Sequence, residues 1–244
     1  MSAFTRVWYV RALRSFISRE LVFLVETKGL CQELTEARER CHYFANYRSG
    51  SPEKGSPEPR RDCDAGVIKF VYLGRIIPSK GIDVAINAIN HLNYVGIACS
   101  LDIYGEGRSS YVDSLKRLIE SKQYIKFFGP VKHEDVQGML SGYDALLLPT
   151  SYHGECMPGV VIEALAAGTL PLTSRHRYLP EIIDEVGFGH ALPIPSFDIE
   201  LQHLVQSGQV TTMTPELART LVKRFNDLYS LDAGALRLQE ILQC

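Results

Sequence analysis

The chain has 244 residues, of which 45% are apolar, and its 26 Lys and Arg against 28 Asp and Glu give a formal net charge of −2. This length suits one large domain, or one domain and a piece of another. The near-neutral charge argues against a nucleic-acid binder, which would carry a basic stripe, and no apolar run is long enough to span a bilayer.

Six cysteines are scattered along the chain without metal-ligand spacing, at positions 31, 41, 63, 99, 156 and 244. This pattern predicts reduced thiols and no metal site. Because the first residues also lack a signal-peptide pattern, we expect a cytoplasmic protein with at most peripheral contact with the inner face of a membrane.

The first 48 residues predict a small α/β segment. We expect a helix at 7–18, a strand at 21–26, a helix at 28–37, and a final strand with its exit at 41–48. Two short strands cannot bury both faces of a sheet. Segment 1–48 is therefore expected to pack on the following domain or on a partner, or to remain unpacked.

A linker rich in Pro, Ser, Gly and charged residues is expected at 49–65, since this composition cannot bury a core. Beyond it, residues 66–244 alternate between strands and helices. Strands are expected at 67–73, 98–104, 125–128, 145–148 and 169–173. Helices are expected at 82–92, 110–122, 133–142, 159–167 and 180–185, with two more between 215 and 242 that divide near 230. This alternation predicts an α/β domain with a doubly wound parallel sheet.

A loop with two cations follows the first strand of this domain. Arg75 and Lys80 lie in the segment Gly-Arg-Ile-Ile-Pro-Ser-Lys-Gly at 74–81, directly before a helix. Two cations at the carboxyl end of a parallel strand can clamp a diphosphate, Arg through its planar fork and Lys as a point charge. Taken alone, both residues are better explained as ordinary surface charges.

A glycine turn, Gly105-Glu-Gly107, follows the second strand. A nicotinamide-binding enzyme would need G-x-G-x-x-G after the first strand, which the loop at 74–81 does not supply. We therefore disfavour a dinucleotide-binding enzyme and expect a structural role for this turn.

Two carboxylates flank the helix start that follows the strand at 145–148. Glu155 lies in the loop, and Glu163 lies in the second turn of a helix that begins near Pro158. The first N–H groups of that helix have no internal partners and favour an anion. Acids on both sides of an anion site make sense if they face hydroxyl groups, as in a nucleoside diphosphate sugar. Glu163 would then accept hydrogen bonds from the ribose and Glu155 from the sugar.

The spacing Glu155-x7-Glu163, followed by Ala-Leu-Ala-Ala-Gly, resembles the E-x7-E motif of retaining glycosyltransferases with the GT-B fold, in particular family 4. The segment at 74–81 resembles the diphosphate-binding loop of that family. Residues 127–131, Phe-Phe-Gly-Pro-Val, resemble its base-contacting segment. The likeness runs from about residue 20 to the C-terminus. It implies that 66–244 form the donor-binding domain and that 1–48 are a remnant of the N-terminal acceptor-side domain.

The resemblance implies a hexosyltransferase that acts in polysaccharide or glycolipid synthesis. Such an enzyme moves a sugar from a nucleoside diphosphate to a sugar, lipid or protein acceptor, with retention of configuration and without a metal or other cofactor. The resemblance assigns catalysis to Glu155, Arg75 and Lys80. It assigns donor binding to Glu163, Met157, Pro158, Gly159, Val160, Val131, Lys132 and His153. For Val131 and His153, the simpler alternatives are a core residue and an exposed loop residue.

The sequence departs from the family pattern at Cys156, where Gly is usual, and at Met157, where an aromatic residue is usual. If the Gly serves a positive φ angle, Cys156 costs about 1 kcal/mol of strain. If it lets a phosphate approach the backbone, donor affinity is reduced.

Only about the last third of the family's first domain is recognisable, without its Gly-rich loop. Three interpretations stay open on the sequence. The chain is an enzyme, naturally split or a fragment, that needs a separate chain for its front domain. Alternatively, it is an inactive nucleotide-sugar-binding module. The third interpretation is a non-hydrolysing sugar-nucleotide epimerase, which shares the GT-B fold.

Overall fold

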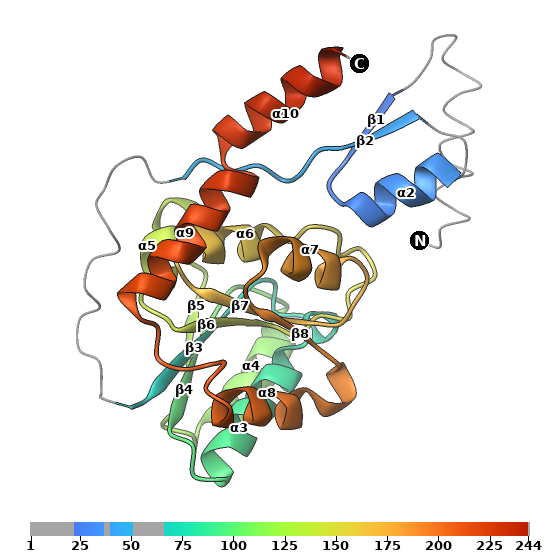
Figure 1. The fold of residues 1–244 in the computed structure, drawn as a ribbon. Coiled ribbons are helices and arrows are strands. Elements are labelled where there is room, and N and C mark those ends of the chain that lie inside the picture. The colour runs from blue at the N-terminus through green and yellow to red at the C-terminus, as the bar shows by residue number, and fades with distance from the viewer. Residues whose placement is uncertain (1–21, 37–39, 51–65, 244) are drawn as a thin grey trace.

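A six-stranded parallel sheet lies at the centre of the protein (Figure 1). The computed structural model describes residues 22–36, 40–50 and 66–243. The helix expected at 7–18 and most of the expected linker lie outside this part. The strand order is β5-β4-β3-β6-β7-β8. The strand bounds are β3 Ile68–Leu73, β4 Cys99–Tyr104, β5 Ile125–Gly129, β6 Ala145–Leu148, β7 Leu170–Ser174 and β8 His190–Leu192.

Helices cover both faces of this sheet, as Figure 1 shows. One layer contains α3 (Ile82–Tyr94), α4 (Ser109–Ile119) and α8 (Phe197–Gln206). The other contains α5 (Val136–Leu140), α6 (Gly159–Ala166), α7 (Leu179–Val186) and α9 (Pro215–Tyr229). The predicted doubly wound α/β sheet is therefore confirmed.

The core is centred on the two neighbouring strands β3 and β6. All four residues of β6 are buried, as expected for a strand with helices on both faces. Helix α3 turns an apolar stripe, from Ile82 to Leu92, toward the sheet, because its apolar residues recur at every third or fourth position. The loops after these two strands form the candidate functional site.

The buried carboxylate of Asp144, just before β6, joins three segments of this domain. It accepts hydrogen bonds from the backbone N–H groups of Lys69 at 2.7 Å and Met213 at 2.6 Å, and the residue is 3% exposed. Lys69 belongs to β3, and Met213 leads into α9. One side chain thus ties the central strands to the C-terminal helices.

Residues 22–36 and 40–43 form a small unit of strand, helix and strand, which we call the N-terminal unit. It consists of β1 (Val22–Val25), α2 (Lys28–Glu36) and β2 (Arg40–Tyr43), and its strands pair in parallel. The strand and helix expected at 21–26 and 28–37 are present over their described residues. The side chains of Val22 and Leu24 are 45% and 49% exposed, so a large part of this small sheet is uncovered.

The N-terminal unit packs on α7 mainly through polar contacts. The Glu181 carboxylate accepts a hydrogen bond from Gly29 N at 3.0 Å, at the start of α2, where a negative charge is favourable. The Glu185 carboxylate contacts Lys28 Nζ at 2.7 Å and the Tyr43 hydroxyl at 3.1 Å. Over its described residues, segment 1–48 packs on the following domain, which is one of the three arrangements expected for it.

The last two helices divide at Ser230, as predicted: α9 ends at Tyr229 and α10 (Leu231–Gln243) follows at once. The segment after β2 passes this junction, where Arg48 N donates to the Tyr229 carbonyl oxygen at 2.9 Å. The segment after β2 and the junction of α9 with α10 are therefore hydrogen-bonded neighbours.

Strand β8 and helix α8 are absent from the sequence-based prediction. β8 has only three residues, His-Ala-Leu, which is too short to show an alternating pattern. The helix expected at 133–142 is a 3₁₀ turn, His133–Asp135, followed by α5. The glycine turn after β4 has the structural role expected of it, because a Cβ at Gly105 would overlap the Gly74 carbonyl oxygen.

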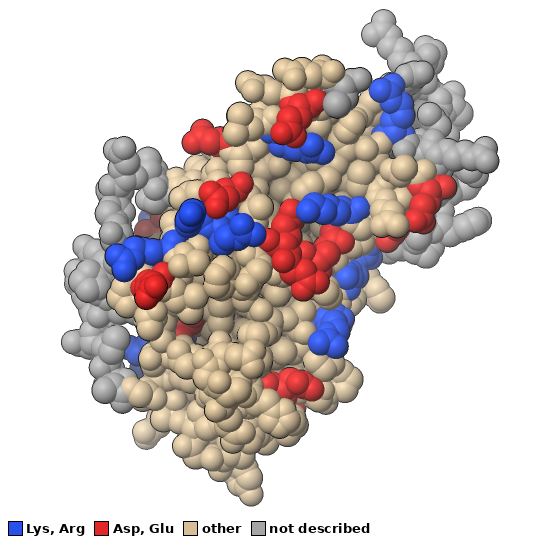
Figure 2. All heavy atoms as spheres, viewed as in Figure 1, with Lys and Arg blue, Asp and Glu red and all other residues tan. Residues whose placement is uncertain are grey.

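Lys and Arg lie interspersed with Asp and Glu on the face of the molecule shown in Figure 2. None of the helices that the structure describes is both long and apolar enough to cross a membrane. Within the described ranges, no group of three His, Cys, Asp or Glu is arranged to hold a metal ion.

Replacement of Asp144 by Ala is expected to lower the free energy of unfolding by about 2–4 kcal/mol. Two backbone N–H groups lose a charged acceptor, and such hydrogen bonds contribute about 1.5–3 kcal/mol each. Urea unfolding measures the loss, with Asp113→Ala on the exposed face of α4 as the control. A loss no greater than that of the control would contradict this role.

Candidate functional site

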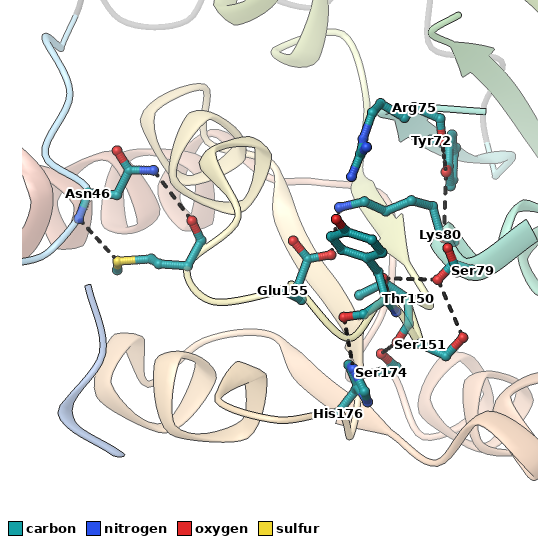
Figure 3. Close-up of polar contacts among 12 residues, drawn as sticks. Asn46, Tyr72, Arg75, Ser79, Lys80, Thr150, Ser151, Glu155, Ser174 and His176 are labelled. Carbon is teal, nitrogen blue, oxygen red and sulfur yellow. Dashed lines mark hydrogen bonds and ion pairs between the residues drawn. The ribbon is translucent and has the colours of Figure 1, made fainter. Parts of the chain in front are cut away.

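Two loops meet at the carboxyl ends of β3 and β6 (Figure 3). The carbonyl oxygen of Ser79, in the first loop, accepts hydrogen bonds from Ser151 N at 2.8 Å and from the Thr150 hydroxyl at 3.2 Å. Gly81 has φ +76°, and a Cβ there would overlap the Pro149 carbonyl oxygen. The loops are therefore packed backbone against backbone, which positions their charged side chains relative to one another.

Tyr72 supports the first loop from inside the core. Its hydroxyl donates to the Arg75 carbonyl oxygen at 3.1 Å, and the Lys80 carbonyl oxygen lies 3.5 Å away. Burial raises the pKa of Tyr72, so the phenol stays protonated and acts as a donor. A single side chain therefore contacts both ends of the segment that carries the two cations.

Lys80 and Glu155 form a buried ion pair between the two loops. Lys80 Nζ lies 2.6 Å from Glu155 Oε2, and the two side chains are only 12% and 7% exposed. A buried charge needs a partner of opposite sign, since leaving one unpaired costs several kcal/mol. The pair therefore fixes the two side chains relative to each other.

Arg75 lies beside this pair and contacts an aromatic ring (Figure 3). Its guanidinium carbon is 4.8 Å from the ring centroid of Tyr152, and Lys80 Nζ is 5.2 Å from the same centroid. Arg75 forms no ion pair with any residue in the described part of the chain. The two cations predicted from the sequence are thus brought together on one ring, and Lys80 is also paired with the Glu155 carboxylate.

The start of α6 adds further positive charge to the site. Pro158 occupies the N-cap position, no side chain caps the helix, and its first turn carries no acidic residue. The backbone N–H groups of Gly159 and Val160 are therefore open to an anion. Arg48 also approaches this helix start, since a Cβ at Gly159 would lie 3.0 Å from Arg48 Nη2.

Lys80, Glu155 and the start of α6 border one cleft of about 370 Å³. Seven of the eleven residues predicted for the site line it: Lys80, Val131, Glu155, Pro158, Gly159, Val160 and Glu163. Glu163 is 20% exposed, and its carboxylate lies 3.9 Å from His133 Nδ1, which also lines the cleft. A cleft lined by a cation, an uncapped helix start and two carboxylates can accept an anion that carries hydroxyl groups.

The other four predicted residues do not line the cleft: Arg75 is exposed and lies beside Lys80 (Figure 3), and the remaining three lie elsewhere. Met157 is 4% exposed, and its sulfur accepts a hydrogen bond from Asn46 N at 3.3 Å, in the segment after β2. Lys132 is 78% exposed, near Glu134. His153 is exposed, and its carbonyl oxygen accepts a hydrogen bond from Arg177.

Cys156 does not have the backbone conformation that would make its side chain costly. Among the described residues other than glycine, only Arg177 has a positive φ angle. The substitution of the usual Gly by Cys therefore brings no strain of that kind.

The sequence that builds this site matches a known protein family. The family model described as "Glycosyl transferases group 1" matches residues 61–198, which is more than half of the chain and includes both loops. The chain belongs to the group 1 glycosyltransferases. This result confirms the predicted family at the level of group 1, whereas family 4 and retention of configuration stay predictions.

Curated relatives of this glycosyltransferase chain include enzymes of polysaccharide synthesis. WcaL of Escherichia coli K12, named as a colanic acid biosynthesis glycosyltransferase, is 30% identical over 176 residues, covering 69% of this chain and 42% of that protein. The glycogen synthase of Mycobacterium tuberculosis is 30% identical over 177 residues, covering 71% of this chain and 42% of the enzyme. The chain thus spans less than half the length of these relatives.

Solved structures share the fold. HepE of Anabaena, crystallised with UDP, matches with a TM-score of 0.72 at 15% identity, over 100% of this chain and 68% of HepE. The pneumococcal O-GlcNAc transferase GtfA, crystallised with UDP and GlcNAc, matches with a TM-score of 0.66 at 14% identity, over 91% of this chain and 44% of GtfA. The predicted GT-B architecture is therefore confirmed for the main sheet of this glycosyltransferase.

Sequence reasoning missed four residues that shape the site of this glycosyltransferase: Arg48, Tyr72, His133 and Tyr152. Tyr72 is the one polar side chain within the apolar strand β3 besides Lys69, which is a weak signal of a buried hydrogen bond. Tyr152 lies three residues before Glu155, so its position in the motif loop was visible. The contacts of Arg48 and His133 depend on the folded arrangement and leave no local pattern.

Replacement of Gly81 by Ala is expected to cost about 2 kcal/mol more stability than replacement of Gly96 by Ala. Both glycines have positive φ angles, +76° and +85°, so both variants carry the same kind of backbone strain. Only at Gly81 does the added carbon meet backbone, because nothing lies within 4 Å at Gly96. Equal losses in urea unfolding would argue against tight packing of the two loops.

Proposed function

We propose that the cleft binds a nucleoside diphosphate sugar, and that the sugar is transferred to an acceptor with retention of configuration, as in glycosyltransferase family 4. The observation that carries the proposal is that Lys80, the start of α6 and the two carboxylates of the motif line one cleft. No metal enters this proposal, because the cations and the helix start supply the positive charge that a diphosphate needs.

Each part of the donor has a candidate partner in the cleft. The diphosphate faces Lys80, Arg75 and the open N–H groups at the start of α6. Glu163 accepts hydrogen bonds from the ribose hydroxyls, and Glu155 accepts them from the transferred sugar. The base lies near Val131, with His133 beside the ribose. The positive groups are aimed at the charge that develops on the leaving diphosphate, which is how an enzyme lowers a barrier electrostatically.

The Lys80–Glu155 pair has a specific consequence for donor binding. When the diphosphate contacts Lys80, the Glu155 carboxylate loses part of its interaction with Lys80 and accepts hydrogen bonds from sugar hydroxyl groups instead. The exchange keeps the buried carboxylate hydrogen-bonded at every stage, which avoids the cost of an unpaired charge.

A second candidate is a donor-binding module that transfers no sugar alone. It is favoured by the N-terminal unit, whose two strands leave Val22 and Leu24 largely exposed. Positioning of donor and acceptor supplies much of the rate in a two-sided cleft, and an acceptor wall needs more than this unit. Under this alternative the chain binds donor, and transfer needs a longer first domain or a partner chain. The acceptor class stays open between sugar, lipid and protein.

A thermal-shift panel of UDP- and GDP-sugars tests the proposal directly. UDP is the first nucleotide to try, since it occupies the HepE and GtfA structures. A melting temperature that rises with one sugar nucleotide supports donor binding, and no rise with any of them at millimolar concentration argues against it.

Replacement of Glu163 by Gln is expected to lower the affinity for UDP, or for GDP if the panel favours it, about tenfold. The amide keeps the shape of the side chain but loses the charge that strengthens its hydrogen bonds to hydroxyl groups. Calorimetry measures the affinity, with Glu134→Gln, at an exposed position, as the control. A lower melting temperature with unchanged affinity would assign Glu163 a structural role.

Replacement of Arg75 by Gln is expected to lower UDP affinity about tenfold and to leave uridine affinity unchanged, because only UDP carries the diphosphate. Calorimetry with the two ligands gives the comparison, and Arg108→Gln at an exposed position is the matched control. Equal losses of affinity for UDP and uridine would show that Arg75 does not contact the diphosphate.

A further inference from the structure

The aromatic ring of Tyr152 lies against both cations of the candidate diphosphate site. Its centroid is 4.8 Å from the Arg75 guanidinium carbon and 5.2 Å from Lys80 Nζ. Both distances fall within the about 6 Å over which a cation is attracted to the electron-rich face of a ring. Tyr152 is thus the one described side chain in cation–π contact with both residues.

Arg75 and Lys80 carry like charges near the same ring, so their repulsion must be offset. Glu155 provides one negative charge, and its carboxylate is paired with Lys80 Nζ at 2.6 Å. A second carboxylate would hold Arg75 in place, but it would also cancel the positive charge that an anionic ligand needs. A ring holds a cation without neutralising it, since it offers a quadrupole and no net charge. Positive charge therefore remains available at the site.

The ring is itself held firmly by the motif loop. Tyr152 N donates to Thr150 Oγ1 at 3.1 Å, and the Tyr152 carbonyl oxygen contacts His176 Nε2 at 3.0 Å. Gly154 packs on the ring so closely that a Cβ there would lie 2.6 Å from Tyr152 Cε1 and 3.0 Å from its Cζ. Gly154 has no positive φ angle, so space for the ring is the reason that the structure shows for a glycine at this position.

We propose that Tyr152 is a positioning residue that pre-orients Arg75 and Lys80 for the diphosphate of the donor, through the face of its ring. This inference rests on the proposed function, because it names what holds the two cations ready in the site that binds the donor. It predicts that the aromatic face matters and that the hydroxyl group does not. Preorganisation of this kind raises affinity by reducing the ordering cost of long side chains.

The test compares Tyr152→Leu, which removes the face, with Tyr152→Phe, which keeps it. Calorimetry with UDP and with uridine is expected to show a three- to thirtyfold loss of UDP affinity in the Leu variant, about the range of one or two cation–π contacts. Uridine affinity is expected to stay within about twofold in both variants, and UDP affinity within about twofold in the Phe variant. Gly154→Ala, which displaces the ring without removing it, is expected to reproduce the loss of the Leu variant.

A second readout needs no ligand. The side-chain Nε–Hε resonance of Arg75 senses the ring current of Tyr152, so it is expected to move in the Leu variant and to stay in place in the Phe variant. Wild-type UDP affinity in Tyr152→Leu, equal losses for UDP and uridine, or an unmoved Arg75 resonance would each overturn the inference. If Arg75→Gln loses UDP affinity while Tyr152→Leu does not, the inference alone fails. If the wild-type chain binds neither UDP nor GDP, the proposed function fails and the inference with it.

Discussion

The site depends on one constraint: β3 and β6 are neighbours in a parallel sheet, so their carboxyl ends deliver two loops to the same edge. Direct backbone contact then joins the loops, with Gly81 against Pro149 and Ser79 against Ser151. No side chain at position 81 fits that contact. The two motifs lie about 75 residues apart in the sequence, yet their charged groups are held within hydrogen-bonding distance. In open α/β sheets this edge is where ligands generally bind.

Charge balance at this edge is the second determinant of the site. One carboxylate, Glu155, faces Lys80, while Arg75 and the start of α6 have no acidic partner among the described residues. Arg75 and the start of α6 thus keep positive charge that no described acidic residue neutralises. An incoming anion must compete with Glu155 for Lys80, but it meets no competitor at Arg75 or at the helix. Inorganic phosphate offers less to such a site than a diphosphate that also carries hydroxyl groups for both carboxylates.

Much of this arrangement could be predicted from the sequence. The alternation of strands and helices predicted the sheet, and the two motifs predicted Lys80, Glu155 and Glu163 at one edge of it. These predictions were possible because local sequence patterns determine where strands, helices and the loops between them form. Other features were out of reach. β8 is too short for a pattern, the Tyr152 contacts arise between loops, and Met157 turned inward toward Asn46 rather than toward the cleft. These features depend on which distant segments become neighbours in the fold. Local sequence patterns do not reveal such contacts.

The interactions that hold the N-terminal unit in place differ from those that stabilise the main sheet. The main sheet is held by buried apolar side chains, whereas the N-terminal unit is held to α7 largely by Glu181 and Glu185, which contact Gly29, Lys28 and Tyr43. Lys28 is 60% exposed, so its interaction with Glu185 is open to screening by dissolved ions. Ionic strength therefore acts on the junction far more than on the sheet. In concentrated salt the Lys28–Glu185 contact is therefore expected to weaken, whereas the buried apolar contacts of the main sheet carry no charge to screen.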